Sequence, residues 1–274
     1  MSKLKLFAKH KQFTFFLILS LVIIGIAIFA PWIAPKDPYT AVMTDSLQSP
    51  NSEYIWGTDK LGRDIFSRVI FGTRASLSMT LSVVSVIFIV GTTLGLIAGF
   101  FGGIIDEIIM RISDIMVSFP GLVLAIAIAG LLGPNMINAV IAIAAVSWPK
   151  YARLARSLVM KIKNSKYIEA AYVIGTSKTN IIIKYILPNI ITTMIVTAAT
   201  DIATMMLELA ALSFLGFGAQ APTPEWGLML NEGRTYLSKA PWLMLYPGLA
   251  IMAVVIIFNM LGDSIRDLLD SKEQ

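Results

Sequence analysis

The chain has 274 residues, of which 56% are hydrophobic and 14% are charged, and its formal net charge is +5. A soluble domain carries about 25% charged residues, so this composition excludes an ordinary soluble fold and indicates a polytopic membrane protein. The sequence has no cysteine and one histidine, His10, which excludes disulfides, thiol nucleophiles, cysteine-ligated metals and histidine-rich zinc sites.

Six hydrophobic runs are candidates to cross a bilayer core of about 30 Å, which takes about 20 helical residues. They cover approximately residues 13–30, 77–101, 115–132, 136–148, 190–216 and 243–261. The fourth run is short and is expected to borrow residues from its flanks. The first run has a basic leader but no small-residue cleavage site after it, so we interpret it as a retained anchor. The sequence therefore predicts an all-α membrane protein with six transmembrane helices.

The basic residues predict the orientation. Fifteen of the 22 lie in the N-terminal tail, the loops 102–114 and 149–189, and the C-terminal tail. Positively charged loops stay in the cytoplasm, so both termini are expected there. Loop 149–189 alone carries eight basic residues and a single acid, Glu169. This asymmetry explains the net positive charge without a nucleic-acid partner.

The segment 164–190 contains helix start and stop signals in the order that predicts a helical hairpin. Ser165 can cap a short helix that extends through Ile174, and Gly175 can supply the left-handed residue that ends it. Thr176 or Ser177 then caps a second helix that runs to about Ile186. Pro188 is expected to end that helix and to mark the turn into the fifth run.

The first helix of this hairpin is expected to place Ile168, Ala171 and Ile174 near one side. Its small residues, Ala170 and Ala171, would let the surface of another protein approach closely. The alternative is a solvated basic loop that only sets the topology. The caps and the glycine favour a docking element.

Several motifs resemble one family of transporters. Glu169, Ala170 and Ala171, followed by Gly175 and then Leu187-Pro188, resemble the "EAA" loop of permease subunits of ATP-binding-cassette importers. Tyr185 departs from the pattern, where isoleucine or histidine is usual. Five further segments resemble the C-type permease of dipeptide, oligopeptide and nickel systems: residues 56–77, 118–126, 212–230, 240–251 and 259–270.

The resemblance implies the type I importer permease fold, with the loop as a coupling helix that sits in a cleft of an ATPase subunit. It implies a bacterial inner-membrane location, a related permease as heterodimer partner, two ATP-binding subunits and an extracytoplasmic substrate-binding protein. The cargo would be small peptides, nickel or metal-chelate complexes. The expected units are residues 1–76, with the tail, first helix and outer segment, and residues 77–274, a five-helix core with the loop at about 150–189.

The chain itself is not expected to be an enzyme. The phosphate-binding pattern G-x-x-x-x-G-K-[S/T] is absent from the sequence, so ATP and Mg²⁺ would be bound by the partner ATPase subunits. We expect no cofactor or metal site in this chain.

Two acids inside the fifth run, Asp201 and Glu208, are candidates to line the translocation path. A charge at mid-bilayer costs at least about 2.5 kcal/mol, so such groups face protein or water. Their spacing of seven places them on one helix face. They could instead hydrogen-bond between helices, or carry protons in a secondary transporter, the alternative function.

The outer segment 54–76 is rich in charge. We expect mainly a structural role for these residues, with the charges pairing with each other; the alternative is a platform for a partner. They are Asp59, Arg63, Asp64, Arg68 and Arg74. Trp226 is expected to anchor at the outer interface.

Overall fold

The computed structural model describes residues 11–270, and most of the basic N-terminal tail, with His10, lies outside them. Throughout this part of the chain the regular elements are helices. In chain order they are α2 (Lys11–Ile33), η1 (Met43–Asp45), α3 (Ile65–Phe101), α4 (Gly103–Val117), α5 (Gly121–Leu132), α6 (Met136–Lys163), α7 (Lys166–Val173), α8 (Lys178–Ile181), η2 (Ile182–Ile186), α9 (Leu187–Phe214), α10 (Trp226–Gly233), η3 (Arg234–Tyr236) and α11 (Trp242–Asp270).

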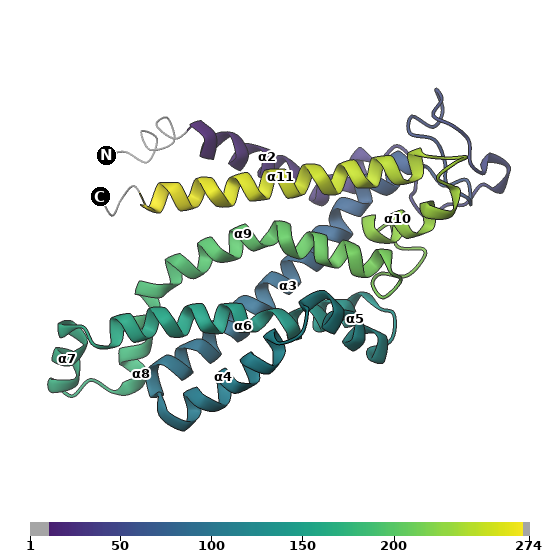
Figure 1. Cartoon of the computed structure of the whole chain (residues 1–274). Coiled ribbons are helices and arrows are strands. Elements are labelled where there is room, and N and C mark those ends of the chain that lie inside the picture. Colours follow the sequence, from purple (N-terminus) through teal and green to yellow (C-terminus); the bar gives the residue numbers. More distant parts are fainter. Residues whose placement is uncertain (1–10, 271–274) are drawn as a thin grey trace.

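The long helices form an elongated bundle with two distinct ends (Figure 1). Helices α2 and α11 lie next to each other, α9 follows, and α6 and α4 form the other side, while α3 crosses the bundle and packs on both α6 and α9. The short helices α7 and α8 project from one end. Helix α10 and the loop before α3 lie at the opposite end.

Within residues 11–270, four helical segments are long and apolar enough to cross a membrane: Lys11–Ile33, Ile65–Phe101, Lys178–Phe214 and Trp242–Leu268. Helices α4 and α5 together would add a fifth, although they are bent by 93° where Pro120 interrupts the helical backbone. The six-helix count is thus not confirmed. Residues 102–114, expected to be a loop, mostly belong to α4, and the short fourth run is the first half of the much longer α6.

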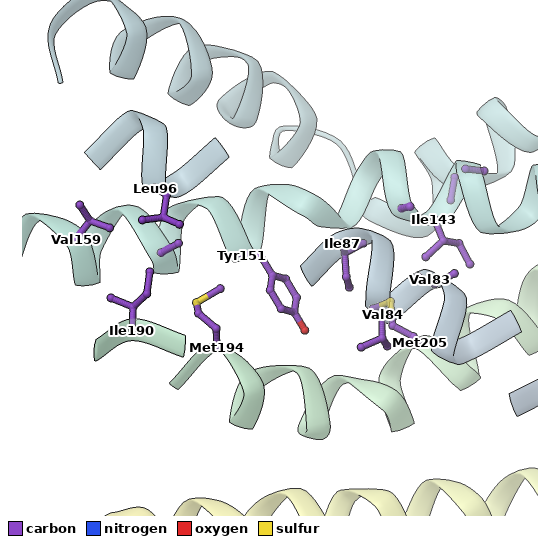
Figure 2. Packing of buried hydrophobic residues seen from close by; sticks show 14 of the residues in the cluster. Val83, Val84, Ile87, Leu96, Ile143, Tyr151, Val159, Ile190, Met194 and Met205 are labelled. Atoms are coloured by element: carbon purple, nitrogen blue, oxygen red, sulfur yellow. The ribbon is translucent and has the colours of Figure 1, made fainter. Parts of the chain in front are cut away.

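Helices α3 and α6 pack most closely, because α3 presents glycines every four residues. A Cβ added at Gly95 would lie 2.7 Å from Ala155 Cβ, and one at Gly99 would lie 2.8 Å from Val159 Cβ. Small residues at this spacing let helix backbones approach, which is how membrane helices gain packing energy. Figure 2 shows the core beside this contact, with the Tyr151 ring extending from α6 towards α9.

The end of the bundle that holds α10 is also tightly packed. Trp226 is buried, and its indole N–H donates to the Val69 carbonyl at 3.0 Å. The expectation of an interfacial anchor for Trp226 is therefore wrong. The physical reason is Gly72, whose missing side chain leaves room for the indole against α3.

Candidate functional site

The hairpin begins with α7, whose end is closed by a left-handed glycine, as expected. Gly175 has φ +79°. The Thr176 N–H donates to the Ala171 carbonyl and the Gly175 N–H donates to the Tyr172 carbonyl, both at 3.0 Å. These two bonds form a Schellman motif, which satisfies carbonyls that a helix end otherwise leaves open. Ser165 occupies the N-cap position but makes no side-chain capping bond.

The second half of the hairpin differs from the prediction. Ser177 caps α8, but the helix does not end at Pro188; it continues through the π-helical turn η2 directly into α9. The Leu187 N–H reaches back five residues to the Ile182 carbonyl. A proline has no N–H and its ring crowds the carbonyl four residues before it, and the wider π turn accommodates both defects. One continuous helical segment therefore links Gly175 to the membrane helix.

The exposed surface of α7 is not the one that the sequence suggested. Ile168 and Ala171 are buried in this chain's own core, so Ala171 is not available to another protein. Glu169 and Ala170 are exposed. Ile174 does not lie with Ile168 and Ala171 but is 76% exposed, because it follows the last turn of a helix that is only eight residues long.

The resulting tip of the hairpin is apolar and open. Val173 and Ile174, which are 86% and 76% exposed, stand immediately before the Gly175 turn, and Tyr172 beside them is also exposed. Leu187 is half-buried and Pro188 is exposed at the base of the hairpin. Large apolar side chains gathered at a solvent-facing turn indicate a surface that another molecule covers.

The second candidate region lies midway along α9. Asp201 is buried at 3% exposure, and its Oδ1 accepts a hydrogen bond from Lys150 Nζ at 2.6 Å. Lys150 belongs to α6, and its side chain remains 61% exposed. Lys150 was expected to lie in the loop 149–189 and instead belongs to the helical stretch Met136–Lys163. Its role as the partner of Asp201 was missed because the two residues are 51 positions apart.

Two polar atoms beside this ion pair make no hydrogen bond of standard geometry within residues 11–270. They are the second carboxylate oxygen of Asp201 and the hydroxyl of Tyr151. The two groups interact with each other through charge and a side-chain hydrogen bond that falls short of ideal geometry, and Figure 2 shows the hydroxyl directed towards α9. Buried polar groups normally find a partner, and here the hydroxyl and the carboxylate serve each other.

Glu208 lies two turns after Asp201 on α9 and is half-buried. Its carboxyl is close enough to Asp201 and Lys150 for their charges to influence one another, although no hydrogen bond or ion pair joins it to them within residues 11–270. Lys150 of α6 is thus a cation near both acids of α9. In the described part of the chain, no group of three or more His, Cys, Asp or Glu residues could hold a metal ion.

At the far end of the bundle, most of the charges of the outer segment pair with each other. Arg63 Nε lies 2.6 Å from Asp59 Oδ2 and its Nη2 lies 3.3 Å from Glu232 Oε2, while Arg68 Nη2 lies 3.2 Å from the same oxygen. Asp64 caps α3 through the Ser67 N–H. Only Arg74, of the charged residues named in this segment, is exposed. The contribution of Glu232 was not visible in the sequence.

The family description "binding-protein-dependent transport system inner membrane component" matches residues 91–273, and "N-terminal TM domain of oligopeptide transport permease C" matches residues 4–50. The chain is 47% identical over 264 residues to the dipeptide transport system permease protein DppC of Alkalihalophilus pseudofirmus, covering 96% of this chain and 87% of that protein. It is 44% identical to the di/tripeptide permease DppC of Pseudomonas aeruginosa (97% and 90% covered) and to the glutathione permease GsiD of Pectobacterium atrosepticum (92% and 84% covered).

The fold agrees with this. A permease chain from inward-facing structures of the MetNI methionine ABC transporter superposes with a TM-score of 0.60 at 19% identity, over 74% of this chain and 97% of that chain. The chain therefore belongs to the inner-membrane components of binding-protein-dependent transport systems, and it is a non-catalytic permease subunit of an ABC importer. ATP is handled by partner ATPase subunits in such a system. Membership of this family decides against the proton-coupled secondary transporter.

Proposed function

We propose that the chain is one of two related permeases in an ATP-driven importer of small peptides. The names of the relatives, which are dipeptide, di/tripeptide and glutathione permeases, support peptides over nickel or metal-chelate complexes. The second permease, two ATPase subunits that bind ATP and Mg²⁺, and an extracytoplasmic binding protein complete the complex. About a quarter of the chain lies outside the fold shared with the methionine permease, and we assign that part to residues 1–76.

We propose further that the hairpin is the coupling element that docks on an ATPase subunit. The observation that carries this assignment is the exposed apolar tip, Val173 and Ile174, held by the rigid turn at Gly175. Glu169 and Ala170 border the tip, while Ala171 holds α7 against this chain's own core. Leu187 and Pro188 belong to the junction through which the hairpin joins α9.

The uninterrupted helical path from α8 to α9 explains how such a hairpin would act. When ATP binding draws the ATPase subunits together, α7 and α8 move with the surface on which they sit. Because no loop separates α8 from α9, that displacement rotates or tilts α9 rather than being absorbed by a flexible link. Helix α9 carries Asp201 and Glu208, so the displacement changes the candidate path directly.

The first test measures transport. The tagged chain is purified with its partners, reconstituted in proteoliposomes with the binding protein, and supplied with labelled alanylalanine. We expect uptake that requires ATP hydrolysis and survives dissipation of the proton gradient. Uptake of nickel instead of the peptide would refute the proposed cargo.

The second test concerns docking. Val173→Asp places a charge in the apolar tip and is expected to lower co-purification of the ATPase subunits at least tenfold. Met43→Asp is the matched control, since Met43 is also a strongly exposed apolar residue, at 67%, and it lies in η1 within the loop before α3. Equal loss of the ATPase in both variants, or in neither, would contradict the assignment.

The third test fixes the orientation, because the hairpin must face the cytoplasm. The chain has no cysteine, so a single introduced cysteine reports its own side. Ser177 and Ser49 are exposed at opposite ends and suit this purpose, whereas the Ser165 hydroxyl is buried. We expect Ser177→Cys to react with an impermeant maleimide only from the cytoplasm and Ser49→Cys only from outside. The reverse labelling would refute the orientation.

A further inference from the structure

One face of α9 carries a stripe of hydroxyl groups. Thr193, Thr197, Thr200 and Thr204 follow each other at intervals of four, three and four residues, and Glu208 comes four residues later. This spacing places them on one side of an α-helix. Thr193 and Thr204 are exposed, and the other members are half-buried. The stripe therefore forms a polar surface along a mostly apolar helix; the Thr197 and Thr200 hydroxyls donate to carbonyls of α9 itself and remain available as acceptors.

The depth of this surface excludes contact with lipid tails. Lys150 lies 14 residues after the start of α6, and Asp201 lies 13 residues before the end of α9. At about 1.5 Å per residue, both are about 20 Å from those helix ends, which is inside a hydrocarbon core of about 30 Å. A charged group at that depth faces protein or water. The exposed Lys150 ammonium therefore faces water or another protein and not the lipid tails.

A second observation indicates that the open side of Lys150 receives a ligand. Its side chain is 61% exposed and is held by only one oxygen of Asp201, although its ammonium group has three donors. The other Asp201 oxygen and the Tyr151 hydroxyl are buried and interact with each other, so they position the ion pair without reaching the open face. The exposed ammonium thus retains unused donors beside the threonine stripe.

We propose that Lys150 and Glu208 form a two-pole binding site for a zwitterionic di- or tripeptide in transit, an inference that rests on the proposed function. Lys150, positioned by Asp201, receives the peptide's carboxylate. Glu208 receives its amino-terminal ammonium. Thr204 lies between them and offers its hydroxyl to the peptide backbone, and the remaining threonines continue the polar surface towards the hairpin end of α9.

The dimensions fit this class of substrate. The rise from Asp201 to Glu208 is about 10 Å, and helical side chains lean towards the N-terminus, which shortens the gap that the substrate must bridge. An extended peptide spans about 3.3–3.6 Å per residue, so two or three residues cover the distance. Hydroxyl groups recognise the backbone and not the side chains, so the site selects for free termini and length without selecting for sequence.

The decisive experiment separates this role from a simple structural ion pair. Lys150→Met, Asp201→Asn and the double variant are compared in the complete complex, with ATP-driven uptake of alanylalanine as the readout and co-purification of all subunits as the folding check. We expect Lys150→Met to lower uptake at least tenfold. The double variant carries no unpaired charge and is expected to assemble normally, but to remain as impaired as Lys150→Met.

Recovery of the double variant to within twofold of the wild type would overturn the proposal, because a structural pair can be replaced by two neutral groups. Thr204→Val and Glu208→Gln are also expected to reduce uptake severalfold. Thr192→Val, an exposed threonine that lies off the stripe, is the matched control and should leave uptake unchanged. A wild-type complex that imports no alanylalanine would refute the peptide cargo itself, which is a different result from failure of the two-pole site.

Discussion

The charged side chains at the two ends of the molecule differ in burial and in pairing. At the end that holds α10, Arg63 and Arg68 are buried and share Asp59 and Glu232 as partners. At the hairpin end, Lys166, Glu169, Lys178 and Lys184 are exposed, and no ion pair joins them to another residue of the segment 11–270. The charges at the α10 end are thus paired within the chain, while the charges and the apolar tip at the hairpin end remain exposed.

This difference separates a structural region from a docking region. A buried ion pair is strongly destabilising to break, whereas an exposed charge contributes little to the stability of its own chain. Variants at the α10 end should therefore affect folding, and variants at the hairpin should affect partners. Substitutions at the two ends test that division.

Glu232→Gln should be the most damaging change at the α10 end. Two arginines and two acids balance each other there, and the substitution leaves two buried cations with one acid. Removing one partner of a buried pair costs about 3–5 kcal/mol. The thermal unfolding midpoint of the purified complex is expected to fall markedly, together with its yield.

The control for this change is Lys36→Met, which breaks the Lys36–Glu53 pair in the same outer region. Glu53 is 70% exposed and Lys36 is 34% exposed, and ion pairs at the surface contribute about 0–1 kcal/mol. A similar loss of stability in the two variants would mean that burial does not distinguish the charges of this segment, and the comparison of the two ends would fail.

The features that the sequence predicted correctly depend on residues that are close together in the chain. Four of the six long apolar runs correspond to helices that could cross a membrane, and the glycine at 175 marks the end of α7, because only a local backbone preference is needed for each. The sequence did not predict the partners of Arg63 and Lys150, which are Glu232 and Asp201, at separations of 169 and 51 residues. Pairing over such distances depends on tertiary packing, which no local pattern encodes.

The errors at the hairpin have the same origin. Pro188 is a strong local stop signal, yet a π turn absorbs it and the helix continues into α9. Ala171 fits a docking surface by its size, but it is buried in the core. Which face of an eight-residue helix is covered by its own chain depends on how the hairpin folds back on the bundle.

Gly175→Val should have a smaller energetic effect but a larger functional one. A Cβ at this position would meet no atom within 4 Å, so the cost comes only from the left-handed φ of +79°. That strain is about 1–3 kcal/mol and is confined to the turn. The variant is expected to assemble in the membrane at normal levels while losing ATPase co-purification and coupled ATP turnover.

Gly25→Val is the matched control, since Gly25 also has open space around it but lies within α2 and has no positive φ. It should retain ATPase binding and coupled turnover. If Gly175→Val kept normal docking and turnover as well, the geometry of the hairpin would not matter for coupling, and the assignment of the docking region would be refuted.

The smallest expected effect concerns Glu225. It differs from Asp59 and Glu232 at the same end because hydrogen bonds, and not arginines, surround its carboxyl group. This carboxylate is buried and accepts from the Gly227 and Leu228 N–H groups, at 2.9 and 2.8 Å, and from the Ser76 hydroxyl. Burial raises its pKa, while the two N–H groups act in the opposite direction without cancelling the effect. The folded chain therefore holds this proton more tightly than the unfolded chain does.

The sign of the pH dependence follows from that direction. A raised pKa stabilises the fold below the pKa of the unfolded chain, and the stabilisation is lost as the pH rises through the folded pKa. The unfolding midpoint of the wild type minus that of Glu225→Gln is thus expected to decrease between about pH 4.5 and neutrality. Taking the difference removes the titration of the other carboxylates, which both proteins share. A difference that stayed constant or increased with pH would contradict this prediction. It would mean that hydrogen bonds fully compensate the desolvation of the charged Glu225 carboxylate, as ion pairs do for Asp59 and Glu232 at the same end.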